Sequence, residues 1–463
     1  MLLLTNPRIQ TFVTKLSATW LSNITGTNVQ ISRINLTLRG AFSLKDLIIE
    51  DRESNPMIQA ERFEFKLTGF KKKKRSVTIG GVNLQNAKIY LKRSKGSELT
   101  NIDQFLEHFT VSPADTLVVP QPKLPWKLKF KDIEVSDSRF VYIDENKMDS
   151  TNKGIDFSNT DLNEITLKAN NLVIRGDTIT VSIANLMMSE KSGFKLSSFS
   201  GNVRFTPHEI SVDKLKAFTN NSSLNLDLKL EYPDFNAFSQ FISKVKIVGT
   251  FRPTIIDMSD IGYFAPTMFT MTDVFGIEGK VSGTVDNFFA KSLDITYGEN
   301  TSFIGNIDIR GLPDIYTTFF KADIQKFTTS AHDLSTFALP NSSGTIPIPE
   351  QLKTAGILQI SGTYTGYPDN FISRIGLNSR FGKINADLTV TTKHTGHEIA
   401  YKGTLTANQF NVGKFLKMEK KLGETSFQLH VNGSGLSKES INLTAKGMVK
   451  SINLLGYNYE NIN

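Results

Sequence analysis

A period-two alternation of apolar and polar residues runs through most of this chain and constrains its fold more than any other feature. The stretch "IEGKVSGTVDNFF" (277–289) begins with isoleucine, glycine and valine on alternate positions, with charged or hydroxyl residues between them. The stretch "ISGTYTGYPDNFI" (360–372) repeats the arrangement. Successive side chains of a β-strand point to opposite faces, so the pattern predicts strands that are apolar on one side and polar on the other.

Both stretches contain a G-x-x-x-G spacing, which also occurs where helices pack together in a membrane. In a strand, the same spacing puts both glycines on the apolar face. Glycine weakens a strand and therefore usually marks a bend or a face that is kept clear of side chains. Two interpretations follow: the glycines keep an apolar lumen wide, or each makes room for a large neighbour such as Phe251 or Tyr364.

The number of such segments favours one long sheet. About 20 strands are expected, nearly all with one polar face, which is typical of antiparallel pairing. A second sheet or a closed barrel would cover the apolar face. At ~4.8 Å per strand, a single sheet of that size would extend about 100 Å and twist into a trough. We therefore predict a mostly β fold: a long, curled, antiparallel β-groove, U-shaped and repetitive, with an N-terminal helix and a few short helices.

The lining of this groove is predicted from the alternation. The alternation slips by one residue at Ser32–Arg33, where we expect a β-bulge. The predicted lining residues are the apolar or glycine positions on one side of each strand: Val29, Ile31, Leu36, Leu38, Phe63, Phe65, Leu67, Leu128, Phe130, Leu172, Ile174, Ile179, Val181, Ile183, Leu224, Leu226, Leu228, Leu230, Ile247, Gly249, Phe251, Ile277, Gly279, Val281, Gly283, Ile360, Gly362, Tyr364, Gly366, Leu429 and Val431.

Helices are expected to be few and short. An N-terminal helix is predicted over Asn6–Ser22, where Asn6 suits the N-cap and Pro7 the first helical position. The other candidates are "TNIDQFLEHF" (100–109), "DFNAFSQFISKV" (234–245), "IIDMSDIGYF" (255–264) and "NVGKFLKMEK" (411–420). The first carries the spacing of a capping box and the second a helical face of phenylalanines. Proline-rich breaks at 118–126 and 339–349 indicate loops.

Composition bounds the class of protein. The chain is 463 residues long, 39% hydrophobic and 21% charged, which argues against disorder. Its net charge of +8 fits a soluble basic protein or attraction to an anionic membrane surface. No nucleic-acid-binding module is recognisable, so no nucleic-acid partner is predicted. The absence of cysteine excludes disulfides and thiolate metal sites and fits the cytoplasm or a bacterial periplasm.

Residues with possible site chemistry are sparse. The run Lys71, Lys72, Lys73, Lys74 and Arg75 reads as a solvated loop tip or as a contact with anionic lipid head groups. His394 and His397 lack a third ligand at a recognised spacing, so no metal is predicted. The N-x-S/T sequons are attributed to composition rather than to glycosylation. No nucleophile elbow, P-loop, dinucleotide fingerprint or zinc-protease helix occurs, so we expect neither an enzyme nor a cofactor.

Both ends of the chain suggest a piece of a longer protein. "MLLL" at the start resembles the last turn of a hydrophobic helix, and "LLGYNYENIN" at the end stops within a strand pattern. No stretch approaches the ~18–20 apolar residues of a spanning helix. We therefore expect a membrane anchor upstream of Leu2.

The opening segment (6–51) resembles the N-terminal entry of the TamB branch of the AsmA-like family of Gram-negative envelopes. That entry consists of a short helix, a Thr-Gly turn, a strand and a Leu-x-Asp-Leu-x-Ile-x-Asp-like stretch. Here the turn is Thr25–Gly26 and the stretch runs from Leu44 to Asp51. The segments "FKKKKRSVTIGGVNLQNAKIYLKR", "SEKSGFKLSSFSGNVRF" and "GNIDIRGLPDIYTTFF" add to the resemblance, which covers essentially the whole chain through the order of its motifs.

The resemblance implies a periplasmic β-groove that is anchored in the inner membrane of the bacterial cell envelope. It implies phospholipid transfer between the two membranes, outer-membrane protein assembly with a TamA-type barrel partner, or both, without catalytic residues. The expected divisions are 1–26 (end of the anchor and N-terminal helix), 27–120 (AsmA-like N-terminal β segment), 121–248 (groove continuation) and 249–463 (glycine-containing β-repeat, truncated at its C-terminal end).

Two alternatives remain open. The first is a scaffold or chaperone that guides outer-membrane or secreted proteins and binds nascent strands by β-augmentation. The second is a membrane β-barrel, whose apolar face would point outward and whose turns would recur about every 10 residues. The predicted helices at Asn6–Ser22 and Asp234–Val245 and the long proline-rich breaks fit a barrel poorly.

Overall fold

The computed structural model describes residues 18–19, 22–23, 25–36, 41–107, 125–147, 153–338, 348–393, 398–435 and 440–462. Several sequence predictions lie outside these residues. They are most of the N-terminal helix, the side chain of Leu36, Leu38, the pair His394 and His397, and the greater part of both proline-rich breaks.

The strands of the described residues all belong to one sheet, which has 24 strands and mostly antiparallel neighbours. The prediction of a mostly β chain with one long sheet and a few short helices is therefore confirmed. The chain divides into two compact units. Unit 1 comprises Met1–Asp227 and Asp260–Phe269, and unit 2 comprises Leu228–Ser259 and Thr270–Asn463. The divisions expected from the sequence stay predictions.

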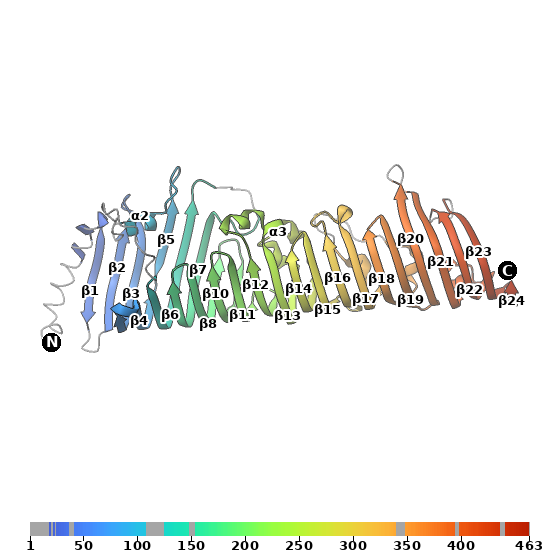
Figure 1. Ribbon diagram of the computed structural model, residues 1–463, viewed down its shortest axis with the longest axis horizontal. Helices are drawn as coiled ribbons and strands as arrows, with labels where there is room; N and C mark the ends of the chain where they lie inside the picture. The colour runs from blue at the N-terminus through green and yellow to red at the C-terminus, as the bar shows by residue number, and fades with distance from the viewer. Residues whose placement is uncertain are drawn as a thin grey trace. The chain divides into compact units, whose positions relative to one another are not determined.

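In unit 1, strands that are consecutive in the chain are mostly neighbours in the sheet (Figure 1). A short helix, α2 (Asn101–Leu106), follows β5, and the 3-10 turn η2 (Lys72–Lys74) joins β3 to β4. The strands are β1 (Val29–Leu36), β2 (Ala41–Glu50), β3 (Pro56–Lys71), β4 (Ser76–Gln85), β5 (Lys88–Arg93), β6 (Lys127–Asp144), β7 (Asn159–Arg175), β8 (Thr178–Glu190), β9 (Lys195–Leu196), β10 (Ser198–Thr206) and β11 (Glu209–Phe218).

Unit 2 is a more regular meander, in which each strand from β13 to β24 pairs antiparallel with the next. Its strands are β13 (Lys246–Asp257), β14 (Val274–Thr284), β15 (Asn287–Tyr297), β16 (Thr301–Arg310), β17 (Phe319–Ser330), β18 (Ile357–Tyr367), β19 (Asn370–Ser379), β20 (Gly382–Lys393), β21 (Glu398–Asn411), β22 (Leu422–Ser434), β23 (Asn442–Leu454) and β24 (Tyr457–Ile462). Strand β12 (Ser223–Glu231) contains the boundary between the units.

The helices of the second half are one or two turns long and stand at the ends of strands (Figure 1). They are η4 (Phe235–Gln240), α3 (Phe241–Lys244), α4 (Met258–Gly262), η5 (Pro266–Thr270), η6 (Ile315–Thr317), α5 (Ala331–Thr336), α6 (Glu350–Lys353) and α7 (Val412–Leu416). The predicted capping box is present at α2, where Thr100 Oγ1 accepts from Asp103 N and Asp103 Oδ2 accepts from Thr100 N.

The phenylalanine-rich stretch at 234–245 differs from the prediction of one α-helix. It forms the 3-10 helix η4 followed by a single α-helical turn, α3. Phe235, Phe238 and Phe241 recur every third residue, which is the repeat of a 3-10 helix, and their rings lie 6.1–6.3 Å apart in sequence order. Phe235 and Phe238 lie in η4, and Phe241 begins α3.

One expectation about strand direction is wrong. Strand β6 pairs in parallel with both β4 and β5. Parallel neighbours need a long crossover connection. The chain between Arg93 and Lys127 is long enough to supply one, so β6 starts at the same end of the sheet as β4.

The β-bulge predicted at Ser32–Arg33 is not formed. The register between β1 and β2 is the same on both sides of it, because Ile31 faces Leu47 and Arg33 faces Lys45. Opposite Ser32, Asp46 has φ +49°, a left-handed conformation that Asp tolerates better than most residues. Both strands are therefore irregular at the same level, and no residue is inserted.

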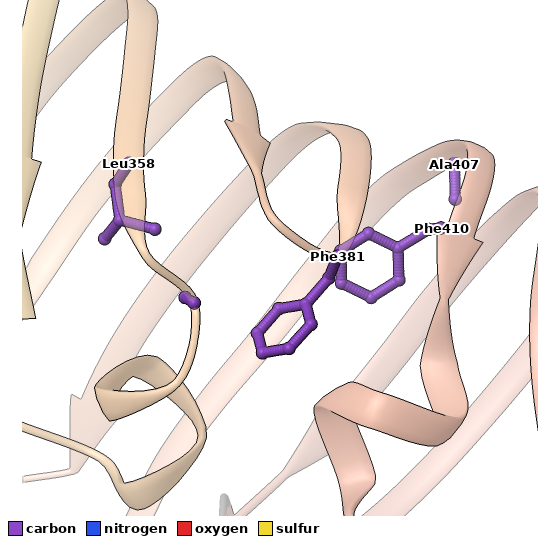
Figure 2. Packing of buried hydrophobic residues seen from close by; sticks show 5 residues of the cluster. Leu358, Phe381, Ala407 and Phe410 are labelled. Atoms are coloured by element: carbon purple, nitrogen blue, oxygen red, sulfur yellow. The ribbon is translucent and has the colours of Figure 1, made fainter. Parts of the chain in front are cut away.

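Most fully buried side chains lie near strand ends. In unit 2 a cluster of Ala355, Leu358, Phe381, Ala407 and Phe410 is closed by partly buried residues of α6 and α7. Figure 2 shows the rings of Phe381 and Phe410 side by side, with centroids 6.2 Å apart. This cluster packs the short helices α6 and α7 against the end of the sheet.

Candidate functional site

The two copies of the glycine-containing motif form the same hairpin. Strand β14 or β18 ends in the second glycine and its successor, a two-residue turn follows, and the next strand begins with Asn-Phe. Gly283 pairs directly with Phe288, and Gly366 pairs directly with Phe371. The repeat is thus a cross-strand glycine–phenylalanine pair on the apolar face.

Cross-strand register aligns the apolar positions of unit 2 into rows, because directly opposite residues share a face. Three rows cross every strand from β13 to β23 without a break, and the pairing places one member of each row on each strand. They are Ile247–Gly283–Phe288–Ile309–Phe320–Gly366–Phe371–Val390–Tyr401–Gly433–Leu443, Gly249–Val281–Ala290–Ile307–Ala322–Tyr364–Ser373–Leu388–Gly403–Val431–Ala445, and Thr254–Ile277–Ile295–Phe303–Phe327–Ile360–Leu377–Ile384–Ala407–Phe427–Val449.

A fourth row of unit 2 starts beyond a bulge. Phe251 faces Gly279, the register then shifts, and the row continues from Leu293. Its members are the pair Phe251–Gly279 before the shift and Leu293–Gly305–Ile324–Gly362–Ile375–Ala386–Leu405–Leu429–Gly447 after it. We call the four rows together the apolar face of unit 2. All thirteen predicted lining residues of this unit from Ile247 onward lie on it.

Unit 1 has an apolar face of its own, which is shorter and more often interrupted by register shifts. Its rows are Phe63–Leu84–Val135–Leu167–Leu186, Phe65–Val82–Ile133–Ala169–Ile183–Gly201, Leu67–Ile79–Phe130–Leu172, and Leu128–Ile174–Ile179–Phe205–Ile210. Val29 and Ile31 pair with Ile49 and Leu47, and Val181 pairs with Val203.

The predicted residues of β12 alternate along their own strand. Leu224, Leu226, Leu228 and Leu230 are separated by Asn225, Asp227 and Lys229. Leu226 is buried, and the other three leucines are half-buried.

Most residues of the apolar faces are half-buried or buried, whereas Leu67 in unit 1 and the β23 members Leu443, Ala445 and Gly447 are exposed. In β18 the residues on the apolar side are half-buried or buried, whereas Gln359, Ser361 and Thr363 on the other side are exposed. All described strands belong to the same sheet, so among the described residues no second sheet supplies this cover. Burial raises the pKa of the Tyr364 hydroxyl to about 12, and Asp369 adds to the shift.

The strand glycines allow backbone conformations and close strand contacts that a side chain would prevent. Gly279, Gly283, Gly362 and Gly366 have φ between +129° and +139°. A Cβ on Gly279 would lie 2.8 Å from Ser292 O, and one on Gly362 would overlap Arg374 O. A side chain at these positions would collide with the neighbouring strand, so the close approach of that backbone requires glycine here. That these glycines also keep a lumen wide stays a prediction. The neighbour interpretation holds for Gly249, where a Cβ would lie 2.8 Å from the Phe251 ring.

Bulges recur along the sheet, and side chains of the next strand complete them. Lys214 (φ +55°) in unit 1 donates its backbone N–H to Asp227 Oδ1 at 2.6 Å. Ser292 (φ +50°) in unit 2 donates to Asn306 Oδ1 at 2.9 Å, and Gln409 (φ +49°) donates to Ser426 Oγ at 3.0 Å. Each bulge increases local twist and bends its strand.

The opposite face is polar and carries the open depressions. In unit 2 one depression lies over Gly376, between Gln359, Asn378, Lys383 and Asn385. A comparable one in unit 1 lies over Gly81, between Ser43, Glu64 and Glu134. Both arise where a glycine stands among long polar side chains. Residues of the apolar faces also line them, Ile360 and Leu377 in unit 2 and Phe65 and Val82 in unit 1. We assign these depressions no function.

The basic run predicted from the sequence lies at the β3–β4 turn of unit 1. Lys71 ends β3, the next three lysines form η2, and Arg75 follows with φ +42°. The four lysines are exposed and Arg75 is half-buried.

Other site chemistry is not apparent in the described part of the chain. No group of three or more His, Cys, Asp or Glu side chains there is arranged to hold a metal ion. Buried carboxylates belong to the framework: Asp333 accepts from Thr301 Oγ1 and Asn300 N, both at 2.8 Å, and Asp144 pairs with Arg93 at 3.0 Å.

Sequence reasoning missed part of the apolar face. It named no residue of β15, β16, β17, β19, β20 or β21, although these strands supply members to every row of unit 2. The signal was present, since "NFFAKSLDITY" and "TSFIGNIDIR" also alternate; bulges shift the alternation within both strand pairs and obscure it.

Comparison with known proteins adds no assignment to this geometry. None of the described helices is long and apolar enough to cross a membrane. No protein-family model, no curated protein and no solved structure matches the chain.

Proposed function

We propose that this chain carries phospholipid acyl chains along its apolar faces between the inner and outer membranes of a bacterial envelope. In this proposal it is a non-enzymatic protein of the TamB/AsmA-like type, lies in the periplasm and is tethered to the inner membrane. The envelope location and the tether rest on the sequence resemblance. A TamA-type barrel is proposed as a partner on the same ground.

The observation that carries the proposal is the continuity of the rows. Three unbroken rows cross eleven strands of unit 2, and nearly every member is apolar or glycine. A fold that needed this surface only for packing would cover it with a second layer. Half-burial without such a layer supports a curled sheet with its apolar side inward, in which recurrent bulges supply the bend.

The energetics fit hydrocarbon as the cargo. Each methylene moved from water to an apolar surface gains about 0.8 kcal/mol, so two acyl chains of ~15 methylenes each would cost on the order of 20 kcal/mol to expose together. A continuous apolar surface removes most of that barrier at every step. An open side leaves the charged head group in water.

Photo-crosslinking with neighbouring positions tests the proposal. Ile360 lies on the apolar face of β18, and Gln359 lies next to it on the polar face. Phe130 and Lys129 form the corresponding pair on β6. A photo-reactive phenylalanine analogue at Ile360 or Phe130 should label phospholipid, whereas the analogue at Gln359 or Lys129 should not. Equal labelling at both members of a pair would overturn the proposal.

The nature of co-purified material separates lipid transfer from the scaffold alternative. Mass spectrometry of the purified chain should detect bound phospholipid. Stable capture of unfolded outer-membrane barrel segments, with no lipid in the preparation and no lipid labelling at Ile360, would favour the scaffold.

A further inference from the structure

We infer that the β3–β4 tip of unit 1 is a docking site for an anionic lipid bilayer, built from basic and exposed aromatic residues of three chain segments. The sequence pointed only to the basic run Lys71–Arg75. The structure adds the segments that begin β6 and end β7. This inference does not depend on lipid transfer along the apolar faces.

Three segments far apart in the sequence meet at this tip. Lys127 N donates to Arg75 O at 2.7 Å, which joins the start of β6 to the β3–β4 turn. Lys127 also pairs across the ladder with Arg175, the last residue of β7. A Cβ on Gly176 would lie 3.5 Å from Pro125, so the β7–β8 turn lies beside the start of β6.

The charge of the tip is strongly one-sided. Residues 70–76, 125–129 and 173–178 contain eight basic residues and one acidic residue, Asp177. Among the described residues, none of these basic side chains forms an ion pair. Lys127 and Arg175 lie directly opposite each other, an arrangement of like charges that destabilises a sheet. An anionic surface would compensate that repulsion.

Aromatic side chains interrupt the basic surface. Phe70 is 61% exposed and Trp126 is 38% exposed. Their rings stack with centroids 5.9 Å apart, and the Arg75 guanidinium lies 5.7 Å from the Trp126 centroid. Leu67, on the same strand as Phe70, is 43% exposed.

This combination favours a bilayer over a nucleic acid. Tryptophan prefers the membrane–water interface, where its apolar body and polar edge are both accommodated, and lysine side chains reach from there to head groups. Each basic residue near an anionic surface contributes about 1 kcal/mol. A nucleic-acid site would offer ring faces to bases, whereas here Trp126 stacks on Phe70 and is approached by Arg75.

The test measures binding to phosphatidylcholine vesicles with and without phosphatidylglycerol. The intact chain should sediment with the phosphatidylglycerol vesicles only, and added salt should weaken binding. Replacing Lys71, Lys72, Lys73 and Lys74 together by Gln should lower the affinity by about 100-fold or more. The matched control replaces four exposed lysines of the polar face of unit 2, Lys291, Lys383, Lys402 and Lys446, and should bind within about threefold of the intact chain.

The aromatic part has a direct reporter. The chain contains two tryptophans, so Trp20→Phe leaves Trp126 as the sole one. Its emission should shift to shorter wavelength on phosphatidylglycerol vesicles. Phe70→Ala with Trp126→Ala should lower the affinity by about 10-fold while keeping the salt dependence.

Three results would overturn the inference. They are unchanged vesicle binding by the four-lysine variant, an equal loss in the unit 2 control, and Trp126 emission that vesicles do not alter. Binding of a labelled single-stranded oligonucleotide through the same four lysines, without vesicle binding, would assign the tip to nucleic acid instead. Since a pure docking defect leaves lipid labelling at Ile360 intact, failure here and failure of lipid transfer are distinguishable.

Discussion

The two units bend their strands by different means. Within the strands of unit 1, most residues with positive φ are not glycine: Asp46, Asp137, Glu164, Asn171 and Lys214 have φ between +48° and +55°. Within the strands of unit 2, most are glycines with larger φ: Gly279, Gly283, Gly362, Gly366, Gly382, Gly403 and Gly447, between +115° and +155°.

This difference explains why the bends of unit 2 could be recognised in the sequence and those of unit 1 could not. The left-handed region near φ +50° is open to Asp and Asn and is reached by other residues at a cost of about 1–2 kcal/mol. The region near φ +130° is in practice open to glycine alone. Bends of the second kind demand a recognisable residue, whereas bends of the first kind do not.

The largest expected effect comes from adding a side chain to a unit 2 glycine. Gly362→Ala should destabilise unit 2 by about 3 kcal/mol or more, because it combines a strained φ with an overlap on Arg374 O. Urea unfolding followed by circular dichroism measures the loss, and faster hydrogen exchange of β18–β19 amides assigns it to unit 2.

The matched control for this change is Gly81→Ala on β4 of unit 1. No atom lies within 4 Å of the Cβ that it would add, and its φ is outside the positive range. This variant should be as stable as the intact chain or slightly more stable. A Gly362→Ala protein with an unchanged urea midpoint would show that the backbone at this position adapts freely, and the contrast between the units would lose its basis.

An intermediate effect is expected at Asp333, which ties α5 to the β15–β16 turn of unit 2. Asp333 is 2% exposed, and burial by itself would raise the pKa of its carboxyl group. Hydrogen bonds from Thr301 Oγ1 and the backbone N–H groups of Asn300 and Glu299 outweigh burial and lower the pKa. Asp333→Ala should cost about 1–3 kcal/mol at neutral pH.

The lowered pKa also predicts an acid dependence. The unfolded chain titrates Asp at about 3.9, so the contribution of Asp333 is full above that pH and falls as pH drops through the lower pKa of the folded state. The difference in free energy of unfolding between the intact chain and Asp333→Asn should therefore become smaller as the pH falls. Urea midpoints measured from neutral to strongly acidic pH check this, and a difference that stays constant would contradict the assignment.

The smallest expected effect is a stabilisation of unit 1 when glycine replaces a residue with positive φ, which is opposite in sign to the effect of Gly362→Ala in unit 2. Lys214→Gly should stabilise unit 1 by up to about 1 kcal/mol, because relief of the left-handed strain exceeds the entropy that glycine costs. Lys216, on the same strand and also exposed, has no positive φ. Lys216→Gly should therefore destabilise by about 0.5–1 kcal/mol. The same sign for both variants, measured by urea unfolding, would remove the strain argument.

Local patterns predicted single elements well. The alternation in "IEGKVSGT" and "ISGTYTGY" identified β14, β18 and the face on which their glycines lie. The Thr100–Asp103 spacing identified the start of α2. These predictions succeeded because they depend on interactions within a few residues of chain.

Relations between strands were less predictable. The parallel place of β6 depends on the long connection before Lys127, whose path no local pattern specifies. The paired irregularity at Ser32 and Asp46 involves two strands at once. The β3–β4 tip, which we propose as a membrane-docking site, joins Phe70 to Trp126. These residues are far apart in sequence and become neighbours only through strand order.

The sequence by itself determined the secondary structure class and the sidedness of the strands, because the two-residue repeat of an extended backbone assigns each side chain to a face. The tertiary structure decided which strands are neighbours and in what register, and hence that the apolar residues form continuous rows. It also decided why the strand glycines are required. A Cβ at these positions would clash with the backbone of the neighbouring strand, and the two backbones come close only after the sheet has formed.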